Sequence, residues 1–149
     1  MDWNREVQRA GDDVEAWIAR VRTGGWTEPV GSAWSNKDLL GHLAAWSNLL
    51  TDQVEAFIRE SPCSTAAVDV DAWNAEQVAL RRARAPGEIV QEWRSSFRRA
   101  VAAAEALPRD VRGRTVSVAW ATDPVSAEDL LQLWVLHVRQ HRARFAEQP

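Results

Sequence analysis

The chain has 149 residues, of which 46% are apolar and 26% are charged, and its formal net charge is −3. This composition is ordinary for a globular domain and excludes a disordered chain, whose apolar content would be lower. The net negative charge differs from the excess of basic residues that is typical of a nucleic-acid-binding protein. The apolar runs are too short to span a membrane. We therefore expect one domain over residues 1–149, with no nucleic acid and no membrane among its partners.

The N-terminus and the cysteine content predict the compartment. Residues 1–6 lack the basic start and the apolar stretch of a signal peptide. Cys63 is the only cysteine, so no internal disulfide can form, as is typical of a reducing compartment. We therefore expect a cytoplasmic protein. Cys63 also lies in a predicted loop with no histidine near it in sequence, which makes it a poor candidate for a catalytic nucleophile.

Apolar spacing and capping residues predict two helices in the first part of the chain. Apolar side chains at intervals of three and four indicate a helix over residues 4–23, which Gly24 and Gly25 end. Ser35 and Asp38 have a capping-box spacing, in which the serine and the acid each bond the other residue's backbone N–H. This pair predicts a second helix over residues 35–60.

The second half of the chain predicts one short helix and two long ones. The short helix is expected around residues 72–83, and Pro86 suits the first turn of a long helix over residues 86–107. Ser126 and Asp129 repeat the capping spacing before a last helix over residues 127–146. Residues 114–120 alternate polar and apolar side chains, which indicates a short extended segment.

Four long amphipathic helices predict an all-α fold, namely a four-helix bundle of the up-down-up-down type with the short extra helix before the third long helix. In that topology the second and the fourth long helices run parallel. Residues at similar distances from the starts of these two helices then lie at similar heights in the bundle.

All three histidines lie on the apolar stripes of two predicted helices. His42 belongs to the second long helix, and His137 and His141 are four residues apart on the last one, so that both rings leave the same face. In parallel helices the three rings would lie within about 6–12 Å along the axis. Three imidazoles can hold one cation and leave other positions open, as a catalytic metal requires. The alternative is that they are hydrogen-bonded core residues.

The ligand type also suggests which metal and which pH range to expect. Zinc or nickel suits an all-imidazole site best among the divalent metals. Protonated imidazole cannot bind a metal, and its ordinary pKa is near 6.5. We therefore expect metal affinity to fall below about pH 6.

Four residues near the histidines are candidates for substrate binding. Trp46 and Trp134 lie about one turn from the predicted ligands, where they either wall a pocket or pack in the core. Arg139 and Arg142 neighbour the ligands in sequence and could bind an anionic group of a substrate or of a thiol cofactor. The alternative for both arginines is a solvated helix face.

Three segments of the chain resemble the DinB-like superfamily of four-helix metalloenzymes. Residues 34–46 (WSNKDLLGHLAAW) resemble the signature of its second helix, and residues 136–141 (LHVRQH) resemble the counterpart on its fourth helix. Residues 70–75 (VDAWNA) resemble a stretch often found between them. The resemblance covers nearly the whole chain. It implies a four-helix bundle that binds a divalent cation through His42, His137 and His141.

The resemblance also implies a set of activities. The superfamily includes isomerases and S-transferases that depend on mycothiol or bacillithiol, and related hydrolases that confer self-resistance to colibactin. It implies a metal-dependent transferase or hydrolase that activates a thiol of the mycothiol type, or water, for attack on a small-molecule substrate. Maleylpyruvate isomerases of this kind carry a further C-terminal domain, for which 149 residues leave no room. The alternative is a non-catalytic bundle, as a monomer or a homodimer, that sequesters a small molecule and holds a structural metal.

Overall fold

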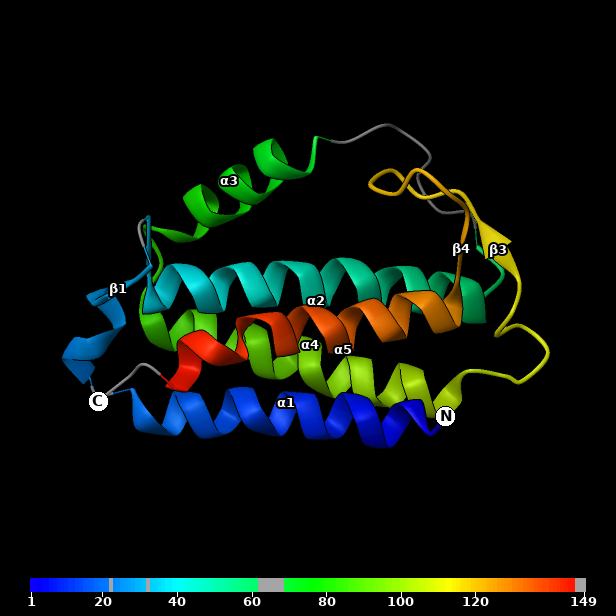
Figure 1. Ribbon diagram of the computed structural model, residues 1–149, viewed down its shortest axis with the longest axis horizontal. Helices are drawn as coiled ribbons and strands as arrows, with labels where there is room; N and C mark the ends of the chain where they lie inside the picture. Colours follow the sequence, from blue (N-terminus) through cyan, green and yellow to red (C-terminus); the bar gives the residue numbers. More distant parts are fainter. Residues whose placement is uncertain (22, 32, 62–68, 147–149) are drawn as a thin grey trace.

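The computed structural model describes residues 1–21, 23–31, 33–61 and 69–146 (Figure 1). Its α-helices are α1 (Trp3–Arg20), α2 (Asn36–Ile58), α3 (Val70–Arg81), α4 (Pro86–Ala106) and α5 (Ala127–Ala146). A 3₁₀ helix, η1, spans Thr23–Thr27, and the short strands are β1 (Pro29–Val30), β2 (Trp34–Ser35), β3 (Thr115–Val116) and β4 (Val125–Ser126). The all-α prediction is confirmed. Within the described residues, no helix combines the length and the apolar character needed to cross a membrane.

Two serine–aspartate pairs set the starts of helices α2 and α5, as the sequence predicts. Asp38 donates its backbone N–H to the Ser35 hydroxyl over 3.2 Å, and Ser35 donates its own N–H to the Asp38 carboxylate over 3.1 Å. Asp129 and Ser126 make the same two bonds at 3.1 and 2.8 Å. Each pair satisfies backbone donors that a helix start leaves without partners.

Helix α1 is shorter than predicted, and a hairpin that the sequence does not predict follows it. Val21 has an extended backbone, with ψ near 116°, so α1 ends at Arg20 rather than at residue 23. Strands β1 and β2 then pair antiparallel, and Gly31 in their turn has φ of +74°, which favours glycine. The predicted extended segment is present only as β3, which pairs antiparallel with β4.

The four long helices do not follow the predicted up-down-up-down order. Helices α2 and α4 run parallel, because Lys37 Nζ donates to the Arg84 carbonyl over 2.9 Å at their starts and Arg99 Nε donates to Glu55 over 3.2 Å near their ends. Helix α3 crosses back over the bundle and returns the chain to the end where α2 begins (Figure 1). The resulting order is up, down, down, up, in which α5 runs antiparallel to α2.

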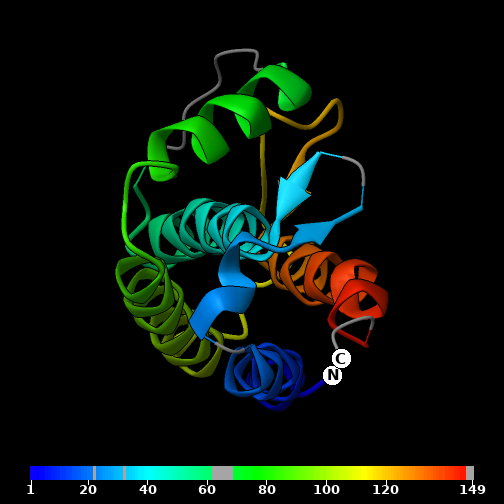
Figure 2. The same ribbon diagram turned by 90° about the vertical axis from the view of Figure 1, so that its left-hand side faces the viewer.

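The core lies between α1, α2, α4 and α5, which surround it when the molecule is viewed along the helix axes (Figure 2). Trp17, Trp93 and Trp134 are at most 2% exposed. The Trp93 ring stacks on the Phe97 and Trp134 rings, at centroid distances of 5.7 and 5.9 Å. A Cβ at Gly11 would lie 2.0 Å from the Phe97 ring, so only glycine allows α1 to pack this closely on α4.

Candidate metal centre

The antiparallel packing of α2 and α5 brings the three histidines together. His42 lies two turns into α2, whereas His137 and His141 lie in the second half of α5, which ends at the same end of the bundle. The Nε2 atoms of His42 and His137 are 2.9 Å apart, and one ring nitrogen from each histidine lies within 4.8 Å of the others. The ring centroids are 4.8–5.1 Å apart. The histidines therefore meet, but in antiparallel helices rather than in the parallel pair expected from the sequence.

Burial keeps all three imidazoles neutral. It lowers the pKa of His42 to about 2, with a smaller contribution from the other two rings. It lowers the pKa of His137 to about 3 and that of His141 to about 4, and the nearby Arg144 charge contributes at His141. A neutral imidazole has the lone pair that a metal ligand needs.

The donor set fits a divalent transition metal. Two Nε2 atoms 2.9 Å apart must share a proton or a cation, because their lone pairs would otherwise repel each other. Nδ1 of His42 is buried and has no hydrogen-bond partner among the described residues. A hydrogen bond at Nδ1 therefore does not account for the burial of this polar ring. Three neutral nitrogen donors match the preference of zinc or nickel.

A cavity of about 350 Å³ adjoins the three histidines. Its walls come from β2, α2, α3 and α5. The residues that line it are Trp34, His42, Trp46, Val70, Asn74, Leu133, His137, Gln140, His141 and Arg144. The candidate metal centre therefore lies in the wall of a space large enough for a small molecule.

Comparison with known families places this chain. The family model described as the DinB superfamily matches residues 6–144. The chain belongs to the DinB superfamily. Comparison with curated proteins and with solved structures gives no significant match. The resemblance in the helix signatures is thus confirmed over nearly the whole chain, and the three-histidine cluster is compatible with a metal-binding enzyme.

The two tryptophans predicted near the site of this DinB protein have different positions. Trp46 lines the cavity; its ring centroid lies 5.6 Å from that of His137, and its indole N–H donates to Asn74 over 2.7 Å. Trp134 lies in the core, where its indole N–H donates to the Ser47 hydroxyl over 2.9 Å. Only Trp46 is brought to the cavity.

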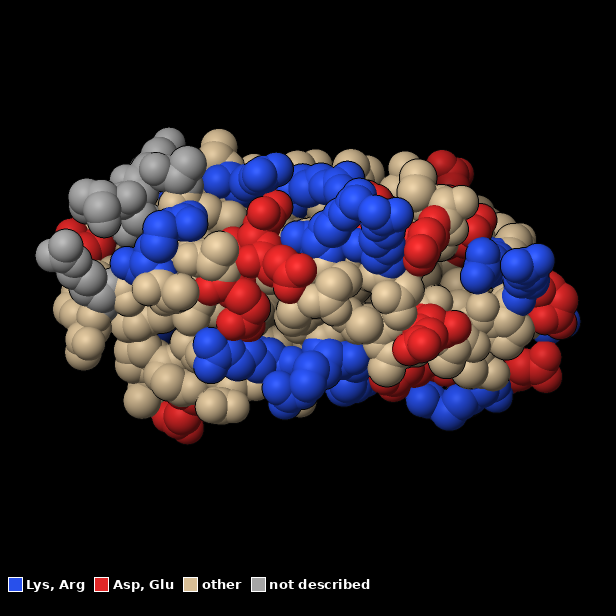
Figure 3. All heavy atoms as spheres, turned by 90° about the horizontal axis from the view of Figure 1, so that it is seen from below, with Lys and Arg blue, Asp and Glu red and all other residues tan. Residues whose placement is uncertain are grey.

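Arg139 and Arg142 lie on another face of α5 from the cavity. Arg139 pairs with Glu6 over 2.7 Å and Arg142 pairs with Asp13 over 3.5 Å, and both acids belong to α1. On this side of the molecule, basic and acidic side chains are interspersed (Figure 3). The structure therefore does not bring these two arginines to the cavity. Cys63 lies outside the described residues.

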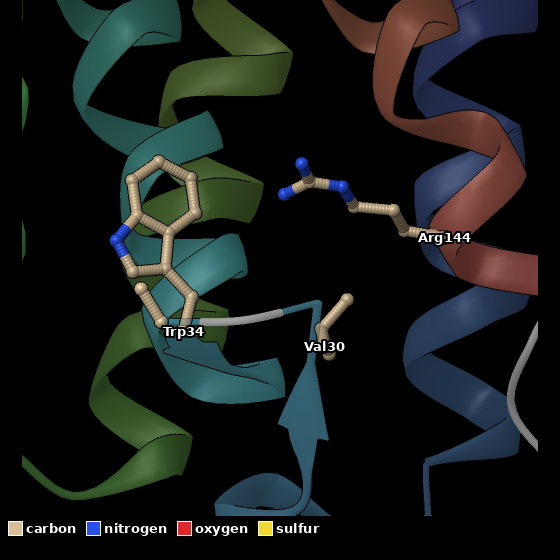
Figure 4. Close-up of a pocket in the computed structure, with 4 residues that line it drawn as sticks. Val30, Trp34 and Arg144 are labelled. Carbon is tan, nitrogen blue, oxygen red and sulfur yellow. The ribbon is translucent and has the colours of Figure 1, made fainter.

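Six of the residues that line this cavity are missing from the sequence-based candidates, among them Trp34 and Arg144. Arg144 extends from α5 towards Trp34, and both residues also line a smaller adjoining cavity of about 170 Å³ beside Val30 (Figure 4). The Trp34 ring lies 4.6 Å from that of His42. Arg144 follows His141 by three residues, so helical spacing could have found it. Trp34 gave no such signal, because its position depends on the unpredicted hairpin.

Proposed function

We propose that this DinB-superfamily protein is a divalent-metal-dependent enzyme in which His42, His137 and His141 hold zinc or nickel. The observation that carries this proposal is the meeting of three neutral imidazoles, one buried and two half-buried, in the wall of a cavity of about 350 Å³. Three neutral ligands leave a divalent cation its full charge and leave coordination positions for a further ligand.

The chemistry proposed is nucleophile activation. When bound, the cation would lower the pKa of a thiol or of water and so supply a nucleophile at neutral pH. The histidines would stay unprotonated because burial lowers their pKa values far below 7. Arg144 would bind an anionic group of the thiol or the substrate, because it lines the cavity and carries a positive charge. Trp46 would form an apolar wall beside His137.

The proposed reaction is transfer of a low-molecular-weight thiol of the mycothiol type to a small electrophile, or a related isomerisation or hydrolysis. Superfamily membership and the three-histidine cluster support metal chemistry. The thiol is suggested by the resemblance to mycothiol- and bacillithiol-dependent enzymes. A free thiol needs a reducing compartment, so a cytoplasmic location belongs to this proposal, as does action of residues 1–149 as one domain.

Metal analysis followed by a thiol-transfer assay tests the proposal. The purified protein should carry one equivalent of zinc or nickel, and a triple variant (His42→Ala, His137→Ala, His141→Ala) should carry none. Arg142→Ala is the control, because Arg142 lies on another face of the same helix. The loaded protein should accelerate attack of mycothiol or bacillithiol on monochlorobimane. Metal retained by the triple variant would refute the ligands, and a loaded protein inactive with both thiols and with water would be a sequestering bundle instead.

A further inference from the structure

A second cavity, of about 180 Å³, adjoins the candidate metal centre and is walled by Trp46, Trp73 and Trp120. We call it the tryptophan pocket. Its three rings come from α2, from α3 and from the segment between β3 and β4. Trp46 and Val70 line both this pocket and the cavity at the histidines. The two spaces are therefore adjacent and meet at these two residues.

The rings of the tryptophan pocket are fixed in orientation and present apolar surface. The Trp46 centroid lies 5.1 Å from that of Trp73 and 5.8 Å from that of Trp120, and both pairs are edge-to-face. The indole N–H of Trp46 donates to Asn74 over 2.7 Å, and that of Trp120 donates to Gln53 over 3.2 Å. Because these two donors are already used, the two rings offer apolar ring surface to a ligand rather than hydrogen bonds.

Size and charge together select the kind of group that fits. An apolar cavity of about 150 Å³ in another protein binds benzene, so about 180 Å³ suits one ring. Aromatic walls also attract cations, but acidic side chains are absent from the described residues that line either cavity. The charged side chain at the larger cavity is Arg144, and the proposed metal would add positive charge. A neutral group is therefore favoured over a cationic one.

We propose that the tryptophan pocket binds a neutral, ring-sized apolar group of the substrate, and that the electrophilic atom of the same molecule lies in the cavity at the histidines. This inference rests on the proposed function, which it extends by naming the substrate class. The Trp46 ring joins the two spaces, because it walls the pocket and lies 5.6 Å from the His137 ring. A ring held in the pocket would thus place its substituent beside the metal ligands.

Titration with benzyl alcohol tests the pocket without any turnover. The readout is the indole ¹H–¹⁵N signal of each tryptophan, assigned by single Trp→Phe substitutions, in zinc-loaded and in chelator-treated protein. The signals of Trp46, Trp73 and Trp120 should shift in both forms. Trp73→Ala and Trp120→Ala should each raise the Kd roughly fivefold, because each removes one aromatic contact. Trp3→Ala is the matched control, because Trp3 is also half-buried and bonds to Glu128 outside both cavities.

Circular dichroism checks that each variant is folded. If an alanine variant does not fold, the phenylalanine variant at the same position, Trp73→Phe or Trp120→Phe, is used in its place. The inference is overturned if benzyl alcohol leaves the three indole signals unshifted, or if all folded variants bind it as well as the parent protein. It is also overturned if tetramethylammonium shifts these signals at lower concentration. Zinc binding, measured on the same samples, separates the two proposals. If zinc binds but benzyl alcohol does not bind in the tryptophan pocket, this inference is wrong. If benzyl alcohol binds there but zinc does not bind, the proposed function is wrong.

Discussion

Two regions of the molecule bury ring nitrogens without partners, and the consequences differ. In the core, Nε1 of Trp17 and of Trp93 has no hydrogen-bond partner among the described residues, and at the metal centre the same holds for Nδ1 of His42. An indole N–H remains neutral at every pH, so the cost of burying it is constant. An imidazole becomes charged when it is protonated, so the cost of burying it depends on pH. The core is therefore a fixed structural element, whereas burial of the histidines disfavours their protonation and keeps their lone pairs available to a metal.

Two core tryptophans and two cavity tryptophans differ in the same way. Trp17 and Trp93 are fully buried and fill the space between helices. Trp46 and Trp120 line cavities, and side-chain amides hold their indole N–H groups. A large aromatic ring can tolerate an unpartnered N–H, which costs about 1–3 kcal/mol, when the rest of the ring is fully packed. At a cavity wall, where packing is incomplete, the hydrogen bond takes over the role of fixing the ring.

The largest expected effect is a loss of stability of the metal-free protein as the pH falls from about 6.5 to 5. The unfolded chain takes up protons on its histidines below their ordinary pKa of 6.5, whereas burial holds the folded pKa values at about 4 or below. The unfolded state then binds more protons, so stability is present above pH 6.5 and is lost below it. The slope of the unfolding free energy against pH approaches about 1.4 kcal/mol per pH unit for each histidine.

Urea unfolding at several pH values measures this slope. A His42→Gln, His137→Gln, His141→Gln variant should lose most of it, because the glutamines do not titrate. A variant as pH-dependent as the parent would show that the two regions do not differ in this way. The lowered pKa values also change the pH range in which metal affinity is expected to fall. In the folded protein, protons should compete with zinc only near pH 4 rather than below pH 6.

The second prediction compares a core tryptophan with a cavity tryptophan. Trp93→Ala should cost about 3–5 kcal/mol of unfolding free energy, because it leaves a hole in a packed core. Trp73→Ala should cost less than about 2 kcal/mol, because Trp73 is half-buried and already borders an open space. Urea titration at pH 7.5 measures both. Equal losses would contradict the division of the tryptophans into two sets.

The third prediction concerns metal affinity. His137→Ala should weaken zinc binding on the order of a hundredfold or more, because it removes one of three protein ligands. Arg139→Ala should leave zinc binding unchanged, because Arg139 pairs with Glu6 on another face of α5. Calorimetric titration of metal-free protein with zinc measures both affinities. If the two variants bind zinc equally well, the histidine region is a second core rather than a metal centre.

Local features of the fold were predictable from the sequence because local interactions determine them. Ser35 with Asp38 and Ser126 with Asp129 marked two helix starts, since each pair bonds within four residues. Pro86 marked the start of α4 in the same way. The spacing of His137 and His141 placed both rings on one helix face. Each of these predictions needs only the geometry of one helix turn.

The helix directions were not predictable, because they depend on where α3 packs. Helical periodicity predicted a short helix there but contains no information about its path across the bundle. The hairpin of β1 and β2 was missed because each strand has two residues, too few to show alternation. Trp34 was consequently not predicted as a cavity residue. Arg144 was missed for a different reason, since its spacing from His141 was visible but two nearer arginines were preferred.

The smallest expected effect separates Arg144 from Arg142, two arginines that are two residues apart on α5. Arg144→Gln should raise the Kd of the zinc-loaded protein for mycothiol roughly fivefold, because one charge-assisted contact at a partly exposed wall contributes about 1 kcal/mol. Arg142→Gln removes the same charge, but its side chain is 65% exposed and faces Asp13. Its Kd should stay within about twofold of the parent value, as expected for a surface pair. Fluorescence titration measures both, and metal content should not change in either variant. Equal effects of the two variants would mean that overall charge rather than position attracts the anion, and Arg144 would then lose its proposed role.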